Sequence, residues 1–319
     1  MIKLEYLRVF ATVAETRALN EAAERLGRTP SAVSMTLKQI EENLGGPLFE
    51  GERKAALTPL GAFVLRHAHR AVSEHDAATA AIQRFARGEE GEVRIAAVPS
   101  AATRLLPGAV ARLRRQRPGV RVNLRDIHSA AVVQAVEQKS VDIGIASPSP
   151  LSASLAEELL FEDPFVLVCR KDHPIAQLGG PAAWSDVDPN EFIANGLCAN
   201  IPSPDVAELA RHAPLMVHNV SSLLAFVSEG FGVTLLPALA TSAEAGDLRT
   251  VPLAAPGAIR RLVSITRPGE TLSPSASALL TEIRLAAKAF SQILAFENDA
   301  ETVAHSDQNR ARESPLEQS

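Results

Sequence analysis

The sequence predicts a multidomain α/β protein with an N-terminal winged helix-turn-helix, a long dimerisation helix and a C-terminal domain of two α/β subdomains. Residues 19–41 hold two short helical patterns of apolar residues around a small turn. Residues 59–87 hold one unbroken amphipathic pattern. From residue 93, apolar runs of strand length alternate with helical patterns, which is typical of parallel strands covered by helices. The expected divisions are 1–58, 59–87 and 91–297, with subdomain I at about 91–161 and 267–297, subdomain II at about 162–266, and a polar, disordered tail at 298–319.

Length and composition indicate more than one globular domain. The chain has 319 residues, of which 46% are hydrophobic, and can therefore form several large cores. No apolar run approaches the roughly 20 residues that span a bilayer. The N-terminus MIKLEYLRVF lacks the apolar core of a signal peptide. We therefore expect a cytoplasmic protein with no membrane partner.

Charge is distributed unevenly along the chain. The net charge is −5, yet residues 1–87 contain twelve Lys or Arg against ten Asp or Glu. No acidic residue lies between Arg25 and Gln39, whereas Arg25, Arg28 and Lys38 are basic. This small excess favours a specific, dimeric reader of nucleic acid over a non-specific polycation.

A short turn separates the two helical patterns of residues 19–41, and the residues at its end favour the start of a helix. Thr29 suits the position before a helix, and Pro30 suits its first turn. The helix start presents Thr29, Ser31 and Ser34, which are small enough to approach DNA and can hydrogen-bond to bases or phosphates. By itself the stretch fits a helix-turn-helix and an ordinary helical hairpin about equally well.

A charged loop follows the second helix. Gly45-Gly46-Pro47 ends that helix, and the short apolar pieces Leu48-Phe49 and Ala56-Leu57 then flank the loop in the pattern of a small β-wing. Arg53 and Lys54 at its tip either contact DNA phosphates or belong to a solvated loop. The residues alone do not decide between these two interpretations.

The helix expected at 59–87 carries an apolar stripe that needs a partner. His67, Glu74 and His75 interrupt the stripe, so the pattern is that of an imperfect coiled coil. We favour dimerisation through this helix, and packing within the monomer is the alternative.

Downstream, the alternating pattern predicts two α/β units in succession. The first is a βαβαβ unit, and the second is looser. The expected strands are 93–98, 120–126, 141–146, 165–170, 192–194, 215–218, 233–236 and 260–265, and the expected helices are 100–116, 130–138, 221–229 and 273–296.

Polar residues follow several of these strands, where ligands of parallel sheets usually bind. Ser100 ends the first strand and either caps the next helix or offers its hydroxyl to a ligand, and the free N–H groups there favour an anion. His128 and Ser129 follow the second strand, and His128 fits a surface loop equally well. Ser147 follows the third. The remaining candidates are Ala101 and Thr103 beside Ser100, and Asn195 and Asn219 of the second unit.

No catalytic or metal-binding constellation is readable in the sequence. The chain lacks HExxH, GxSxG, P-loop and GxGxxG motifs, and its histidines lack metal-ligand spacing. We therefore expect neither an enzyme nor a cofactor. The pair Glu157-Glu158 is expected on a solvated helix surface. Two cysteines exclude a disulfide scaffold; Cys169 is expected as a buried small hydrophobe, and a redox pair with Cys198 has no support.

Taken together, these residues resemble the LysR-type transcriptional regulators over nearly the whole chain. The residues that carry the resemblance are Phe10, Val13-Ala14-Glu15, Ala22-Ala23, Leu26, Ala32-Val33-Ser34, Glu41, Leu44-Gly45, Leu48-Phe49, Leu57-Thr58 and Gly61, then Asp142-Ile143-Gly144-Ile145, His173-Pro174 and the GFGVTLLP run ending at Pro237. The resemblance implies a regulator that binds double-stranded promoter or operator DNA. Its effector domain would be similar to type 2 periplasmic binding proteins and would hold a small organic effector, with an anion as one candidate, between two subdomains.

The resemblance also implies site residues and an assembly. Effector-binding positions of the family match Ser100, Thr103, Ser129 and Ser147, with Asn195 and Asn219 less closely matched. The candidate DNA-binding residues are Thr29, Ser31, Ala32, Ser34, Met35, Lys38, Arg53 and Lys54. The implied assembly is a homodimer through the linker helix and, in many family members, a homotetramer.

The chain departs from the family pattern at several DNA-facing positions. Pro30 stands where the family often has Gln, and Met35 where it often has Arg. Gly51 stands where the family usually has a wing Arg, and Arg17-Ala18 replaces a usual Gly-Ser pair. We therefore expect recognition to depend more on Thr29, Ser31, Ser34 and Lys38 and on DNA shape than on bidentate base contacts.

Overall fold

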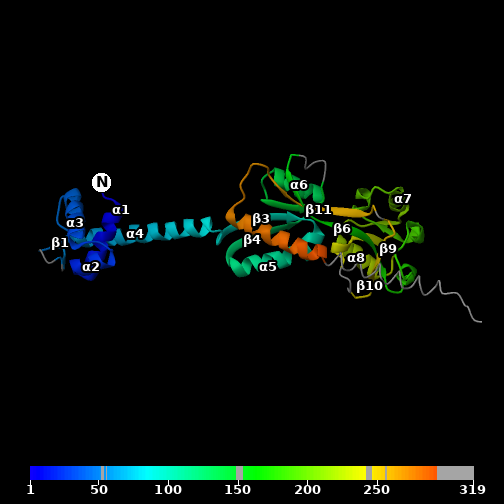
Figure 1. The fold of residues 1–319 in the computed structure, drawn as a ribbon, viewed down its shortest axis with the longest axis horizontal. Coiled ribbons are helices and arrows are strands. Elements are labelled where there is room, and N and C mark those ends of the chain that lie inside the picture. The colour runs from blue at the N-terminus through cyan, green and yellow to red at the C-terminus, as the bar shows by residue number, and fades with distance from the viewer. Residues whose placement is uncertain (52–53, 55, 149–153, 242–245, 256, 293–319) are drawn as a thin grey trace, which may run out of the picture. The chain divides into compact units, whose positions relative to one another are not determined.

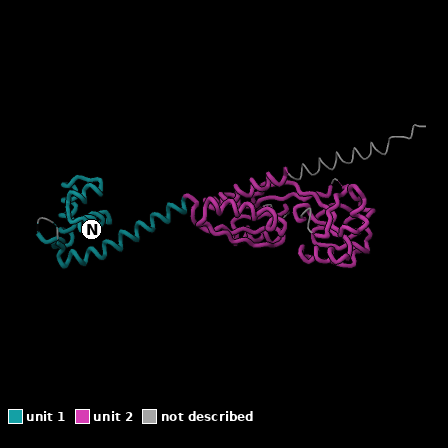
Figure 2. Tube along the Cα trace, turned by 90° about the horizontal axis from the view of Figure 1, so that it is seen from below, with its two compact units in different colours: residues 1–86 teal, residues 87–319 magenta. Residues whose placement is uncertain are grey.

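The computed structural model describes the chain except residues 52–53, 55, 149–153, 242–245, 256 and 293–319. The expected disordered tail and the end of the last helix therefore lie outside the described residues. The chain divides into two compact units, Met1–Ala86 and Arg87–Ser319, which Figure 2 shows in two colours.

Unit 1 is a helical domain with a two-stranded wing. Its elements are α1 (Leu4–Thr16), α2 (Leu19–Arg25), α3 (Pro30–Leu44), β1 (Phe49–Glu50), β2 (Ala56–Leu57) and α4 (Pro59–Ala86) (Figure 1). The strands β1 and β2 are antiparallel. Phe10 is fully buried at the centre of the core and meets Phe49 of the wing edge-on, with ring centroids 5.4 Å apart. This contact joins the helices to the wing.

Local chemistry explains the turn between α2 and α3. Gly27 has φ of 63°, a left-handed conformation that glycine adopts without steric cost. Thr29 is the N-cap of α3, and its hydroxyl accepts a hydrogen bond from the Ala32 amide at 3.3 Å. Pro30 is the first helical residue, as the sequence predicts. The result is a compact helix-turn-helix.

Close backbone contact fixes the junction between the wing and α4. Thr58 donates to the Pro47 carbonyl at 2.7 Å and accepts from the Gly61 amide at 2.9 Å. A Cβ at Gly61 would lie 2.0 Å from the Leu48 carbonyl oxygen. Only glycine therefore fits at this position, which explains its place in the motif.

Unit 2 contains two α/β subdomains whose sheets are joined through a shared strand. The first sheet has the order β4 (Gly119–Asp126), β3 (Glu90–Ala97), β5 (Ile143–Ala146), β11 (Ile259–Thr266), β6 (Ala156–Arg170). The strands β3, β4 and β5 are parallel, as the βαβαβ pattern predicts. The helices of this subdomain are a π-helical turn (Ala101–Leu105) that continues into α5 (Leu106–Gln116), α6 (Ser129–Glu137) and the helix at 274–292.

The second sheet is built on the far half of β6. Its other strands are β9 (Val233–Pro237), β7 (Phe192–Ala194), β8 (Leu215–Met216) and β10 (Leu248–Pro252), and its helices are α7 (Pro204–His212) and α8 (Val220–Ser228). Each subdomain has its own apolar core, with residues such as Ile95 and Ile143 in the first and Leu167 and Phe192 in the second. The strand β6 belongs to both sheets (Figure 1).

Two expectations drawn from the sequence are wrong in this region. The return to subdomain I occurs at β11, not at residue 267, because Val263–Ile265 pair with β5 of the first sheet. Glu157 and Glu158 lie on strand β6 rather than on a helix, and they pair with Ile265 and Ser264. An apolar run indicates a strand but does not show which sheet it joins, and an exposed acidic pair looks the same in sequence on a strand as on a helix.

Candidate nucleic-acid interface and ligand cleft

The exposed face of α3 carries four of the candidate DNA-binding residues. Ser31, Ser34, Met35 and Lys38 are exposed, and Met35 has an exposed fraction of 73%. The opposite face buries Val33, Leu37 and Ile40. The separation follows from helical spacing, because residues three, four and seven apart share one face.

The first turn of α3 is partly committed to its own structure. The Thr29 hydroxyl caps the helix and lies 3.1 Å from the Ser31 hydroxyl. Ala32 is only partly exposed. Both hydroxyls remain at the surface, so a DNA phosphate or base edge can replace solvent around them.

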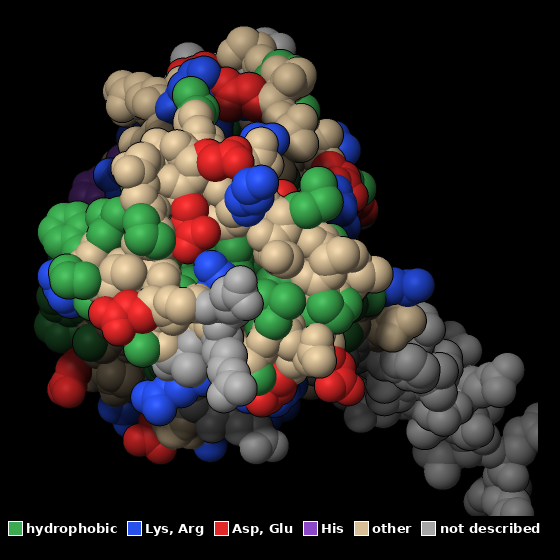
Figure 3. Space-filling view, turned by 90° about the vertical axis from the view of Figure 1, so that its left-hand side faces the viewer, with side chains coloured by type: hydrophobic (Ala, Val, Ile, Leu, Met, Phe, Trp, Pro, Cys, Tyr) green, Lys and Arg blue, Asp and Glu red, His purple; other side chains and the backbone are tan. Residues whose placement is uncertain are grey.

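Most basic residues of unit 1 near this face have acidic partners. Arg25 pairs with Glu21 at 2.9 Å, and Arg28 pairs with Glu5. Lys38 forms no ion pair within the described residues. In the face shown in Figure 3, Lys and Arg side chains are interspersed with Asp and Glu, which agrees with the modest charge excess in the sequence.

The wing places Lys54 against the protein. Its ammonium group lies 3.4 Å from Glu41 and 5.5 Å from the centre of the Phe49 ring. Glu41 also accepts from the Leu48 amide at 2.9 Å, so this contact orders the start of the wing. Arg53 lies outside the described residues.

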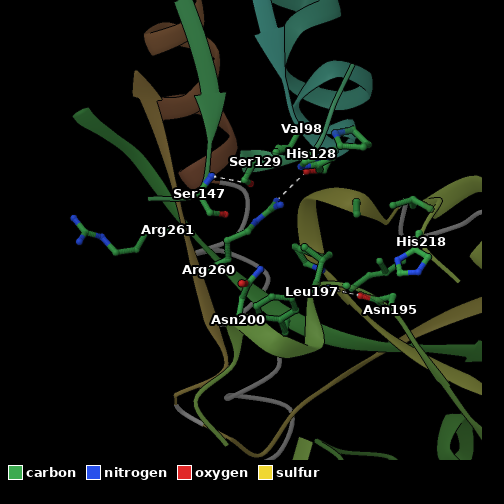
Figure 4. Close-up of a pocket in the computed structure, with 18 of the residues that line it drawn as sticks. Val98, His128, Ser129, Ser147, Asn195, Leu197, Asn200, His218, Arg260 and Arg261 are labelled. Carbon is green, nitrogen blue, oxygen red and sulfur yellow. Dashed lines mark hydrogen bonds between the residues drawn. The ribbon is translucent and has the colours of Figure 1, made fainter. Parts of the chain in front are cut away.

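A cleft of about 800 Å³ lies between the two subdomains of unit 2. Both sheets contribute to its walls, and Figure 4 shows labelled residues from both subdomains around it. The lining residues are Val98, Pro99, Ser100, His128, Ser129, Ala130, Ser147 and Pro148 from the first subdomain, and Phe165, Asn195, Gly196, Leu197, Asn200, His218, Val220, Leu223, Leu236, Pro237, Ala240, Ile259, Arg260 and Arg261 from β6, the second subdomain and β11.

Five of the eight candidate effector-binding residues line this cleft. They are Ser100, His128, Ser129, Ser147 and Asn195. His128 caps α6, its Nδ1 accepting from the Ala131 amide at 3.3 Å. The Ser129 hydroxyl accepts from the Ser147 amide at 3.4 Å and so connects the start of α6 with the residue that follows β5.

Asn195 is buried and fully engaged within subdomain II. Its amide nitrogen donates to the Leu235 carbonyl at 2.8 Å and to the Thr234 hydroxyl at 3.2 Å, while its oxygen accepts from the Leu197 amide at 2.9 Å. The side chain therefore shapes the cleft wall, with its hydrogen-bonding groups used inside the protein.

The other three candidates lie away from the cleft lining. Ala101 is buried in the core, and the Thr103 hydroxyl donates to the Pro99 carbonyl at 2.9 Å. Asn219 is exposed and caps α8, where it accepts from the Ser222 amide at 3.2 Å. These side chains stabilise the elements that carry the cleft. Sequence position beside a strand end did not distinguish capping from lining.

Sequence reasoning missed Arg260, which is 7% exposed and lines the cleft. Its Nη2 donates to the Ser100 hydroxyl at 2.9 Å and to the Asp163 carboxylate. Arg260 and Asp163 are direct neighbours on β11 and β6, the two strands that connect the subdomains. Ser100 makes no capping hydrogen bond, so the capping interpretation of its hydroxyl is wrong.

Asp163 is completely buried beneath the cleft. Burial raises the pKa of the Asp163 carboxyl group, while Arg260 and the Leu239 amide oppose that rise. The Leu239 amide donates to Asp163 at 3.0 Å. The ion pair joins β11 to β6, and it is also hydrogen-bonded to Ser100 of the first subdomain and to Leu239, which follows β9. The sequence carries no local signal for this pair, because Asp163 follows Glu162 and Arg260 precedes Arg261 in strands that carry further charges.

Comparisons with known proteins decide the family. The family model described as "LysR substrate binding domain" matches residues 86–288, and "Bacterial regulatory helix-turn-helix protein, lysR family" matches residues 4–62. The chain belongs to the LysR family of bacterial transcriptional regulators.

Curated relatives and solved structures agree with this LysR membership. "Transcriptional dual regulator GltC" of Bacillus subtilis is 30% identical over 286 residues, covering 86% of this chain and 94% of the relative. A "Probable hydrogen peroxide-inducible genes activator" of Mycobacterium avium is 29% identical, covering 82% and 86%. The crystal structure of CbnR, a LysR family regulator, has a TM-score of 0.68 at 20% identity and covers 88% of this chain and 100% of CbnR.

The LysR assignment confirms the predicted fold class and function. The protein is an effector-controlled, DNA-binding transcriptional regulator rather than an enzyme. The helix-turn-helix interpretation of residues 19–41 is therefore correct, and the plain helical hairpin is wrong. Within the described residues, no helix combines the length and apolar character needed to cross a bilayer.

Neither cysteine of this LysR protein has the surroundings of a reactive thiol. Both are buried. Burial raises the pKa of the Cys169 thiol to about 11 and also raises that of Cys198. A high pKa keeps a thiol protonated and therefore weakly nucleophilic.

Proposed function

We propose that this LysR regulator reads its operator with the exposed face of α3 and binds its effector in the cleft between the two subdomains. The DNA contacts would come from Thr29, Ser31, Ala32, Ser34, Met35 and Lys38, with Arg53 and Lys54 of the wing near phosphates. The effector contacts would come from Ser100, His128, Ser129 and Ser147. The observation that carries the proposal is the cleft itself, where side chains from both subdomains converge.

The proposed assembly is a homodimer through α4 that pairs into a homotetramer in the cytoplasm. Support comes from apolar side chains of α4 that stand in solvent, with exposed fractions of 54% for Phe63 and 69% for Ile82. The proposed domains are the reading domain at 1–58, the linker helix at 59–87 and the effector domain at 91–297. Two-fold assembly would match a pseudo-palindromic operator.

A bulky substitution in the cleft tests the effector site. Asn200 lines the cleft and is exposed, so Asn200→Trp fills space there without removing a buried contact. We expect a metabolite that alters the gel shift of the full-length protein on its own upstream DNA to lose that effect in this variant, while specific DNA binding persists. Ala199→Trp is the matched control, because Ala199 is exposed and next in sequence but outside the lining. An unchanged metabolite response in Asn200→Trp would show that the effector binds elsewhere.

A further inference from the structure

Arg260 lines the cleft, and its side chain contains a buried hydrogen-bond donor without a partner. Among the buried side-chain atoms of the described residues, the Arg260 Nε lacks a hydrogen-bond partner. The side chain is 6% exposed, so bulk solvent does not satisfy this group. In Figure 4 the Arg260 side chain points toward the side formed by His128 and Ser129. A buried donor without an acceptor is unfavourable, and a ligand atom that accepts from it removes that cost.

Two serine hydroxyls on this side of the cleft can donate to a ligand. Ser100 uses its oxygen to accept from Arg260, and Ser129 uses its oxygen to accept from the Ser147 amide, so both hydroxyl hydrogens remain available to donate. No Asp or Glu side chain is among the lining residues described. A ligand group with several acceptor oxygens fits this arrangement.

The opposite wall of the cleft carries a group of apolar side chains beside the polar Asn195, Asn200 and His218. Phe165, Leu197, Leu223 and Leu236 line it from subdomain II and β6. A ligand that spans the cleft therefore meets hydrogen-bond donors at one end and hydrocarbon at the other. This combination favours a molecule with an oxygen-rich head and an apolar body.

The charge of Asp163 limits the charge of such a head group. Asp163 is in contact with Arg260 and neutralises one positive charge beside the site. A dianion would add two uncompensated negative charges to a buried region, whereas a monoanion adds one that the Arg260 Nε and the serine hydroxyls can solvate. The balance favours a carboxylate over a phosphate monoester.

We propose that Arg260 recognises the effector and that the effector is a small monocarboxylate with an apolar body. One carboxylate oxygen accepts a hydrogen bond from the Arg260 Nε, while Nη2 keeps its hydrogen bonds to Asp163 and Ser100. The proposal rests on the effector site proposed above. Arg260 lies opposite Asp163 on β11 and β6, the two strands that connect the subdomains. The bound carboxylate would therefore contact these connecting strands directly.

The test compares acids with their uncharged amides on the full-length protein. The probes are pentanoate and 3-phenylpropionate, pentanamide and 3-phenylpropanamide, and inorganic phosphate, with affinities measured by isothermal titration calorimetry. We expect each carboxylate to bind the wild-type chain roughly tenfold or more tightly than its amide, as one charge-assisted hydrogen bond provides. Phosphate should bind more weakly than either carboxylate.

The decisive variant is Arg260→Gln/Asp163→Asn, which removes both charges and leaves no unpaired buried ion. It should bind acid and amide about equally, and a cooperative thermal transition with retained DNA binding shows that it folds. Arg121→Gln is the matched control, because Arg121 is an exposed arginine outside the cleft lining, and it should keep the wild-type preference.

The possible outcomes separate this inference from the proposed effector site. A preference for acid that survives in the double variant, or tighter binding of phosphate or amides by the wild type, would overturn the role of Arg260 but leave the cleft in place. Carboxylate binding that is unaffected by Asn200→Trp would instead overturn the effector site itself. No binding of either carboxylate at millimolar concentration would show that the proposed ligand class is wrong.

Discussion

At the residue scale, short side chains on α3 determine how this helix can contact DNA. Ser31 and Ser34 each offer one hydroxyl, Met35 is apolar, and Lys38 supplies the positive charge on the face. None of the first three can form a bidentate hydrogen bond to a base pair. If α3 contacts DNA as proposed, close approach of the helix and the shape of the DNA would contribute a larger share of specificity than in a protein with Arg or Gln at these positions.

Substitution of these side chains distinguishes sequence-specific hydrogen bonding from electrostatic attraction to DNA. We expect Ser34→Ala to weaken specific binding by about 1 kcal/mol, because one hydrogen bond is lost, with little effect on binding to random DNA. Lys38→Ala should weaken both and reduce the salt slope by about 1. Quantitative gel shifts over a salt series measure these effects. Lys171→Ala, which removes an exposed charge in unit 2, should change neither; unaltered affinity in both α3 variants would mean that another surface reads the DNA.

At the scale of elements, α4 is attached to the reading domain by a specific contact. Arg8 of α1 donates to both carboxylate oxygens of Asp76 on α4. Upstream on α4, Val64 and Ala68 pack into the core of unit 1. The hydrogen bonds from Arg8, and to a smaller extent from His75, lower the pKa of Asp76 to about 2. The ion pair is therefore formed throughout the physiological pH range.

The low pKa of Asp76 predicts how its contribution depends on pH. Because the pKa is lower in the folded chain than its ordinary value of 3.8, the pair stabilises the fold above that value, and the stabilisation disappears as the pH falls toward 2. Asp76→Asn should therefore speed hydrogen exchange of α1 and α4 in the full chain by the same modest factor at pH 7 and pH 5. Glu74→Gln, an exposed neighbour on α4, serves as control. Loss of the difference already at pH 5 would contradict the assigned pKa.

At the scale of the whole molecule, α4 forms the end of unit 1, and unit 2 begins at the next residue. Beyond its contact with α1, the helix keeps apolar side chains in solvent, with Ile82 at 69% and Phe85 at 51% exposed. Such side chains on a 28-residue helix gain stability when a second copy covers them. The proposed dimer provides that cover, and a dimer places two reading helices on two half-sites.

A charge on this stripe tests the dimer. Ile82→Glu would place a carboxylate among apolar side chains, so we expect it to raise the dimer dissociation constant by at least tenfold, corresponding to about 1.4 kcal/mol, and to weaken operator binding. Sedimentation equilibrium of the full-length protein measures the association. Gln83→Glu adds the same charge one residue away on an exposed position and should have little effect. Equal association of both variants would rule out the proposed helix face.

Local sequence patterns were sufficient to predict the positions of helices and strands, but not the tertiary contacts that their side chains make. The apolar periodicity of α3 and the Thr29-Pro30 start predicted its position, because helix formation and capping depend on residues close in sequence. The same reasoning placed Ser100, Ser129 and Ser147 at one sheet edge, since parallel strands end together. It failed for Asn219 and Thr103, whose hydrogen bonds to nearby backbone groups look the same in sequence as ligand-facing positions.

The sequence by itself determined the α/β class, the helix-turn-helix and the family, because these follow from short-range periodicity and from motifs of adjacent residues. Only the tertiary structure decided which side chains meet in the cleft. Arg260 contacts Ser100 across 160 residues of sequence and Asp163 across 97. Those contacts require β11 and β6 to pair with Arg260 opposite Asp163. The register of two paired strands is set by the packing of both sheets and not by either strand alone.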